Sequence, residues 1–181
     1  NNSQIMYIGT GELYSPQQAL GNGIWKSIDG GASWNNVYKV RGTTSSGTVP
    51  GTYYITDIVV RDNDGSNLTT NDSEVFAAIG ASFYSSNPIS TFVGTNDYGI
   101  FKSTDNGSNW SQVTLGAGAD KVAPNDFEIG KDNILWLGTT RNVYGKTGGR
   151  VYSSSDGINF TLKHTITDGR RTEIAVSKTN A

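Results

Sequence analysis

One phrase decides the fold: Ser27-Ile28-Asp29-Gly30-Gly31-Ala32-Ser33-Trp34. The chain repeats it as Ser103-Thr104-Asp105-Asn106-Gly107-Ser108-Asn109-Trp110, and in a shorter form as Ser154-Ser155-Asp156-Gly157-Ile158-Asn159-Phe160. A phrase that recurs at such a spacing is typical of a repeat architecture, in which each copy belongs to one supersecondary unit.

Short apolar or alternating runs surround each copy of the phrase. An alternating run leads directly into it at residues 23–27, 99–103 and 150–154. An apolar run that ends near a glycine lies upstream at 5–10, 75–81 and 134–139, and a third run lies at 56–60, 125–129 and 172–176. Such runs predict β-strands. With a last strand that leaves each phrase, the unit has four strands, A to D, and the phrase forms the turn between C and D.

Four-stranded antiparallel units at this spacing are typical of the blades of a β-propeller. The sequence therefore predicts an all-β chain that covers about three blades of a larger ring, because propellers close with roughly four to eight blades. Residues 1–40 are expected to hold strands B to D of a first blade, 54–115 a second blade, 125–164 a third, and 172–177 strand A of a following blade. The remaining blades are expected from the same longer chain or from a partner chain, and the chain alone is expected to self-associate through its open edges.

The residues of the phrase are assigned structural roles. The Asp side chain can bond backbone N–H groups within the turn, and the glycine supplies a position with positive φ. The aromatic residue covers the turn and anchors strand D. These residues are Ser27, Asp29, Gly31 and Trp34; Ser103, Asp105, Gly107 and Trp110; and Ser154, Asp156 and Phe160.

The pattern Ser-x-Asp-x-Gly-x-x-Trp resembles the Asp-box, also called the bacterial neuraminidase repeat. Together with residues 7–12 and 23–27, it is similar to the Asp-box propellers of secreted bacterial proteins, such as sortilin-type domains and xyloglucanase-type glycoside hydrolases. The resemblance implies a secreted or cell-surface protein of bacterial origin, with the Asp-box turns on the face opposite the binding site.

Composition excludes several classes of function. The formal net charge is −2, from 14 basic and 16 acidic residues, so no basic surface for nucleic acid is expected. The chain contains no cysteine for a disulfide or a thiolate metal site, and His164 is its only histidine. No apolar run approaches 18 residues, so no membrane span is expected. We expect no cofactor, with calcium as the one ion left open.

Long connections between B and C and between D and A are expected to share one face of the propeller. They lie at residues 12–22, 82–98 and 38–54 and are rich in aromatic residues, on which sugar rings stack well. The alternative is that these aromatic side chains fold back and pack the loops. The candidate ligand-binding residues on them are Tyr14, Tyr53, Tyr54, Tyr84 and Tyr98.

Three carboxylates fall at equivalent places near the start of strand A: Asp57, Asp126 and Glu173. They could bind a cation or polarise a sugar at the mouth of the central channel. Repetition favours the alternative that each bonds backbone amides at its strand entry, since a catalytic residue should be singular. Asp62 and Asp64 resemble a calcium loop in composition, but a glycine follows at the wrong offset, which favours a solvated turn.

The favoured function is a non-catalytic extracellular or cell-surface module that binds a glycan or protein ligand through its aromatic-rich loops. The alternative is a glycoside hydrolase, xyloglucanase-like or acting on another polysaccharide, whose catalytic carboxylates lie partly outside this segment. No catalytic residue is assigned. The absence of cysteine argues against a sortilin-like peptide receptor, and the absence of an Arg-Ile-Pro signature argues against a sialidase.

Overall fold

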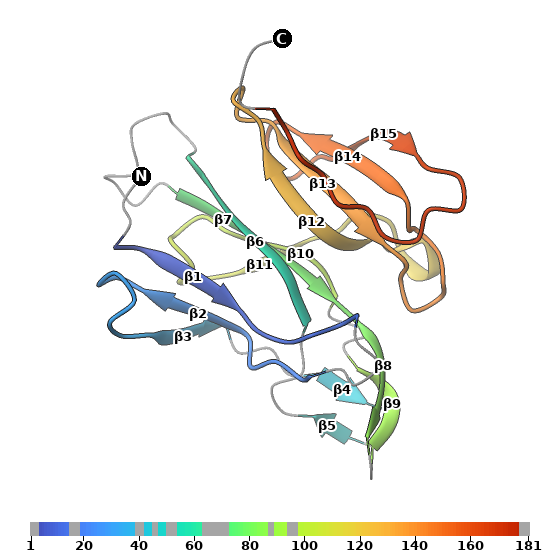
Figure 1. Ribbon diagram of the computed structural model, residues 1–181, viewed down its shortest axis with the longest axis horizontal. Helices are drawn as coiled ribbons and strands as arrows, with labels where there is room; N and C mark the ends of the chain where they lie inside the picture. Colours follow the sequence, from blue (N-terminus) through green and yellow to red (C-terminus); the bar gives the residue numbers. More distant parts are fainter. Residues whose placement is uncertain are drawn as a thin grey trace.

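The computed structural model describes residues 4–14, 19–38, 42–44, 47–49, 54–62, 73–86, 89–93 and 98–177. These residues form strands β1–β15 and one short 3-10 helix, η1 (Gly118–Asp120). Figure 1 shows three antiparallel sheets that follow one another along the chain. The chain is therefore all-β, and the sheets have the form of propeller blades, as the sequence predicts.

Each blade is a meander of neighbouring strands. The first blade has the order β1 (Met6–Gly9), β2 (Ile24–Ser27) and β3 (Asn35–Tyr38). The second has the order β6 (Tyr54–Asp62), β7 (Ser73–Gly80), β10 (Gly99–Ser103) and β11 (Ser111–Val113). The third has the order β12 (Ala123–Ile129), β13 (Leu135–Thr140), β14 (Arg150–Ser154) and β15 (Thr161–Thr165). In the last two, these strands take the places A to D.

Three segments differ from their expected form. The connection expected as a loop at 38–54 contains a hairpin of β4 (Gly42–Thr44) and β5 (Gly47–Val49). The connection at 82–98 contains a hairpin of β8 (Ser82–Ser86) and β9 (Ile89–Val93). Residues 172–177 form no strand, because beyond a single bridge between Arg171 and Thr140 the described residues offer them no ladder.

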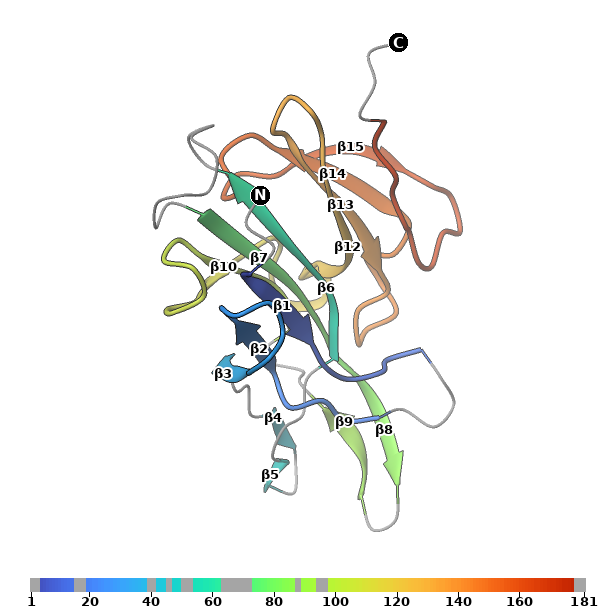
Figure 2. The ribbon, with the colours of Figure 1, turned by 60° about the vertical axis from the view of Figure 1, so that its left-hand side comes forward.

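The core lies between the blades, because successive residues of a strand point to opposite faces of its sheet. One cluster joins Ile24 of the first blade to the second blade through Ile55, Ala77, Ile79 and Phe101. The other joins the second blade to the third. Its buried members are Phe76, Ala78, Ile100, Val122, Phe127, Leu135, Leu137 and Tyr152. Figure 2 shows the sheets side by side, so the second blade is covered on both faces by its two neighbours.

The turns between strands C and D are built from side chain to backbone bonds. Asp29 Oδ1 accepts the Ser33 N–H at 2.9 Å, and the Trp34 indole donates to the Gly31 carbonyl at 3.0 Å. The second copy repeats these bonds at 2.8 and 3.0 Å. The φ angles of Gly31, Gly107 and Gly157 are 91°, 83° and 68°, a region that favours glycine.

The third turn is shorter by one residue. Ser154 Oγ accepts the Gly157 N–H three residues on, whereas Ser27 and Ser103 accept from the glycine four residues on. Asp156 Oδ1 accepts two backbone N–H groups there, from Ile158 and Asn159. The deletion therefore tightens the turn without removing its hydrogen bonds.

Candidate functional site

A tyrosine of the first blade reaches across to the third. Tyr14 lies on the connection that follows β1, and its hydroxyl donates to Oδ1 of Asn125 in β12. The Tyr14 backbone N–H bonds Glu12 Oε1 at 2.5 Å, which fixes the loop locally. Tyr14 keeps 41% of its surface exposed, so it is anchored at its hydroxyl while part of the residue faces solvent.

Arg171 holds the tyrosine ring in place. Its guanidinium carbon lies 4.1 Å from the centroid of the Tyr14 ring, within the range of a cation–π contact. Arg171 Nε donates to Asn125 Oδ1 at 3.3 Å, and Nη2 donates to Glu173. We name Glu12, Tyr14, Asn125, Arg171 and Glu173 the Tyr14 cluster.

The Tyr14 cluster combines three kinds of group on one exposed surface. Glu12 and Glu173 are carboxylates and Arg171 is a cation, so the cluster carries a net charge of about −1 at neutral pH. Burial raises the pKa of the Tyr14 hydroxyl above its usual value. The hydroxyl therefore keeps its proton and stays a hydrogen-bond donor. Asn125 is buried beneath, where its amide group donates to the Thr172 carbonyl at 2.8 Å. The surface therefore offers an aromatic ring, guanidinium donors and carboxylate acceptors.

Two of the other candidate tyrosines, Tyr54 and Tyr98, do not present such a surface. Tyr54 is 0% exposed and opens β6 rather than lying on a loop, and Tyr98 is 1% exposed. The Tyr98 hydroxyl donates to the Lys121 carbonyl at 3.4 Å, and burial raises its pKa to about 12. These two rings follow the alternative interpretation, in which aromatic residues pack the loops. Tyr53 and the side chain of Tyr84 lie outside the described residues.

Two of the three strand-A carboxylates join successive blades. Asp57 accepts the N–H of Ile58 at 2.8 Å and that of Phe127, in the next blade, at 2.6 Å. Asp126 accepts the Ile174 N–H at 2.6 Å. Burial is the largest influence and raises the pKa of both carboxyl groups, while these backbone bonds oppose the shift. Asp57 thus bonds one amide of its own strand, that of Ile58. The other two amides, those of Phe127 and Ile174, belong to the strand or segment that follows.

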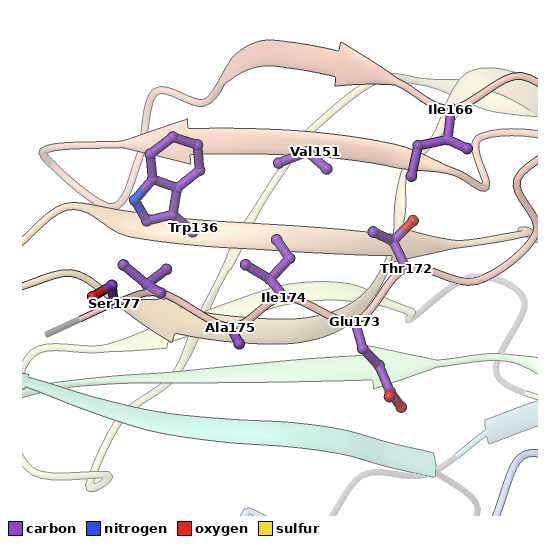
Figure 3. A pocket seen from close by; sticks show the side chains of 9 residues that line it. Trp136, Val151, Ile166, Thr172, Glu173, Ile174, Ala175 and Ser177 are labelled. Atoms are coloured by element: carbon purple, nitrogen blue, oxygen red, sulfur yellow. The ribbon is translucent and has the colours of Figure 1, made fainter. Parts of the chain in front are cut away.

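Glu173, the third of these carboxylates, is exposed. Figure 3 shows its side chain pointing away from Ile174 and Trp136. Its partner is Arg171, so it belongs to the Tyr14 cluster. Of the eight ligand-binding candidates, the structure therefore brings together Tyr14 and Glu173.

The described residues contain neither a group of metal ligands nor a helix that could span a membrane. Among the described residues, no three or more His, Cys, Asp or Glu side chains are grouped so as to hold a metal ion. Asp62 ends β6 and its carbonyl accepts from Asn133 at 2.7 Å, while Asp64 lies outside the described residues. No helix in the described part of the chain is long and apolar enough to cross a membrane.

Three members of the Tyr14 cluster were missed from the sequence: Glu12, Asn125 and Arg171. Asn125 had a signal, because the equivalent residues of the other two copies are Thr56 and Thr172. A polar residue that departs from the repeat at one place is a sign of a singular role. In the sequence, Arg171 is marked only by its neighbour Arg170.

The comparisons with known proteins support the fold. No protein-family model matches the chain, and no curated protein matches it. Among solved structures, the chain is similar to a GH74 enzyme from Niastella koreensis, with 24% sequence identity and a TM-score of 0.58. The alignment covers 90% of this chain and 20% of that one, so the chain spans about a fifth of the length of the structure it matches.

Proposed function

We propose that the chain is part of a non-catalytic β-propeller of the Asp-box kind that binds a glycan outside a bacterial cell. The ligand would contact the Tyr14 cluster. The observation that carries the proposal is the exposed Tyr14 ring, fixed through its hydroxyl and stacked by Arg171 next to Glu173. Ring and charged groups come from two blades, so the site depends on the folded propeller.

The chemistry of the cluster suits a sugar. The apolar face of a pyranose ring packs on an aromatic side chain, which buries area at little cost in side-chain entropy. Neighbouring sugar hydroxyls can both donate to a carboxylate and accept from a guanidinium, as Glu173 and Arg171 would allow. The two carboxylates would repel an acidic sugar, so a neutral glycan fits better than an anionic one.

The second candidate is a glycoside hydrolase, and the GH74 enzyme among the similar structures favours it. Such an enzyme needs two carboxyl groups about 5 to 9.5 Å apart across the scissile bond. Asp57 and Asp126 already accept backbone N–H groups, so Glu173 is the better candidate for one member of the pair. The other member would come from residues outside this segment.

Binding to soluble neutral polysaccharides tests the proposal. Xyloglucan, mixed-linkage β-glucan and galactomannan serve as probes, with affinity measured by titration calorimetry. The variant Tyr14→Ala should weaken binding by about fivefold or more, since a stacked aromatic ring contributes roughly 1 kcal/mol beyond its buried area. The matched control is Tyr144→Ala, an exposed tyrosine outside the cluster, which should bind like the wild type.

Because the second carboxyl group would lie outside this segment, the same probes separate the two candidates in a longer protein that contains both groups. Release of new reducing ends that disappears in Glu173→Gln would favour the hydrolase. Binding without release supports the non-catalytic module. Failure to bind any of the three polysaccharides, or an equal loss in Tyr14→Ala and Tyr144→Ala, would contradict the Tyr14 cluster as the site.

A further inference from the structure

The two inner blade interfaces repeat one contact between an aromatic ring and a turn glycine. The Tyr7 hydroxyl in β1 donates to the Asn106 carbonyl at 2.8 Å, and a Cβ added to Gly107 would lie 3.0 Å from the Tyr7 ring. In the second blade, Phe76 holds the place of Tyr7, and a Cβ on Gly157 would lie 2.4 Å from its ring. Each strand-B aromatic therefore packs on the C–D turn of the following blade.

At each inner interface a backbone N–H of strand A also bonds the preceding blade, in one of two ways. The Ile55 N–H bonds the Thr10 carbonyl at 3.1 Å, and the Phe127 N–H bonds the Asp57 carboxylate at 2.6 Å. Residues 171–177, which we name the terminal segment, make both kinds of bond to the third blade. Thr172 N–H bonds the Thr139 carbonyl at 2.9 Å, and Ile174 N–H bonds the Asp126 carboxylate at 2.6 Å. The terminal segment thus occupies the place of a strand A.

In the part of the chain that the structure describes, the first blade lacks the strand A that the other two blades have. In the second blade β6 pairs with β7, and in the third β12 pairs with β13. The equivalent place beside β1 holds no strand among the described residues, since β1 pairs only with β2. Within the described ranges, the terminal segment therefore has no strand-B partner in a sheet of its own, and β1 has no strand A.

Residues that are buried in the inner interfaces are exposed at the two outer faces. Ile8 lies opposite Trp25 in the first blade, as Ala77 lies opposite Phe101 and Leu137 opposite Tyr152. Ile8 is 44% exposed, whereas Ala77 and Leu137 are 0% exposed. Both the strand edge and the apolar side chains of this first outer face are thus open within the described structure.

The outer face of the third blade is hollow and apolar. Trp136, Val151, Ile166 and Ile174 line an open cavity of about 520 Å³ (Figure 3). Trp136 and Val151 hold the places of Phe76 and Ile100, both of which are buried in the inner interface. Ser153 stands where Lys102 reaches the next turn to bond the Asp156 carbonyl, so this face lacks that lysine.

We propose that the outer face of the third blade binds the outer face of the first blade of a second copy of this chain. The terminal segment of one copy pairs with β1 of the other, and Trp136 packs on the turn that contains Gly31. A head-to-tail contact makes a closed ring when its rotation closes. Two copies supply six blades, which lies within the usual range of propellers. The second copy is the occupant because its first blade supplies the strand B that the terminal segment lacks.

Light scattering coupled to size-exclusion chromatography of the 181-residue chain tests the pairing. The wild type should show twice the mass of one chain. Ile8→Asp and Trp136→Asp should each show the monomer mass, because each places an unpaired charge in the apolar contact. Mixed in equal amounts, the two variants should return to the doubled mass, because one of their two possible interfaces has both faces intact.

Leu162→Asp is the matched control, because Leu162 is 49% exposed but pairs with Tyr152, whose side chain faces the second blade. It should keep the doubled mass. A cooperative melt like that of the wild type shows that each variant folds, and Ile174→Asp tests the third-blade face if Trp136→Asp does not fold. A monomeric wild type would overturn the proposal and assign the faces to other blades of a longer chain. A dimer that the variants leave intact, a mixture that stays monomeric, or open polymers would also overturn it.

Discussion

The carboxylate of Asp57 accepts the backbone N–H of Phe127 at 2.6 Å, which ties strand A of one blade to strand A of the next. Asp126 makes the equivalent bond to Ile174. A strand A has one edge without a ladder partner in its own sheet, so its N–H groups need acceptors elsewhere. Asp57 and Asp126 meet that need, which gives a structural reason for an acidic residue at this place in two of the three copies.

Replacing Asp57 should weaken the joint between the second and third blades. In Asp57→Ala, the N–H groups of Ile58 and Phe127 lose their acceptor in a partly buried place. An unsatisfied buried donor costs about 1–3 kcal/mol, so we expect the free energy of unfolding to fall by that amount. Urea denaturation measures it. The control is Asp120→Ala, whose exposed carboxylate has only a 3.9 Å contact with Lys146 and should cost less than about 0.5 kcal/mol. Equal losses of unfolding free energy in the two variants would contradict the role of Asp57 as the acceptor that joins the two blades.

An alanine at Gly157 should be far more costly than one at Gly145. The two glycines have φ angles of 68° and 72°, so the backbone strain is the same, about 1–2 kcal/mol. A Cβ at Gly157 would meet Phe76 at 2.4 Å, whereas a Cβ at Gly145 meets nothing within 4 Å. Overpacking adds about 1–3 kcal/mol at Gly157 alone. Thermal unfolding of both variants measures the difference. Similar melting temperatures would show that the Phe76 ring moves aside for the added Cβ at little cost.

Local turn chemistry explains why the sequence predicted the blades. The Ser-x-Asp turns are held by bonds within eight residues, so their spacing located strands C and D in all three copies. The hairpins in 42–49 and 82–93 were expected as loops, since their short polar strands carry little apolar alternation. The sequence could not predict that residues 172–177 form no strand, because a strand needs a neighbour that lies elsewhere in the chain or in another molecule.

The candidate site was predictable only in part, because its contacts are remote in sequence. Tyr14 and Asn125 are 111 residues apart, and no local pattern joins them. The burial of Tyr54 and Tyr98 likewise depends on tertiary packing, which the length of a connection does not show. The departure of Asn125 from its repeat was the one usable signal.

The turn carboxylates should make stability depend on acidic pH. Hydrogen bonds from Ser33 lower the pKa of Asp29 to about 2, and those from Asn109 lower the pKa of Asp105. The folded chain therefore prefers the charged form. This contribution is present above the unfolded pKa, about 3.9, and is lost as the pH falls toward the folded value. Asp57 and Asp126 act in the opposite sense, because their pKa values are raised. Their contribution to the stability of the folded chain is lost as the pH rises.

Melting temperatures between pH 2 and pH 5 test the turns. In Asp29→Asn, the difference from the wild type should be largest near pH 5 and shrink as the pH approaches the folded pKa. Asp168→Asn, on an exposed turn, should follow the wild-type curve throughout. A difference that stays constant with pH would show that the Asp29 charge has no part in the stability of its turn.

Glu74 forms ion pairs with two buried cations at the interface of the second and third blades. Arg61 Nε donates to Glu74 Oε2 at 2.8 Å, and Lys102 Nζ lies 2.5 Å from Glu74 Oε1. All three side chains are buried, and both cations also bond carbonyls of the third C–D turn. Removing the shared carboxylate leaves two positive charges with too few acceptors. We expect Glu74→Leu to lower the free energy of unfolding by about 3–5 kcal/mol, measured by urea denaturation.

Three further variants separate the loss of an ion pair from the burial of uncompensated charge. Glu173→Gln removes an exposed partner of Arg171 and should cost less than about 1 kcal/mol. The double variant Glu74→Leu with Lys102→Met should recover part of the loss, since one buried cation disappears with the carboxylate. Because hydrophobic replacement of a whole buried charge cluster is often neutral, the triple variant with Arg61→Met should recover more. If the single variant costs less than 1 kcal/mol, or if the double variant is worse than the single, the buried charges are already hydrated and Glu74 does not hold the two blades together.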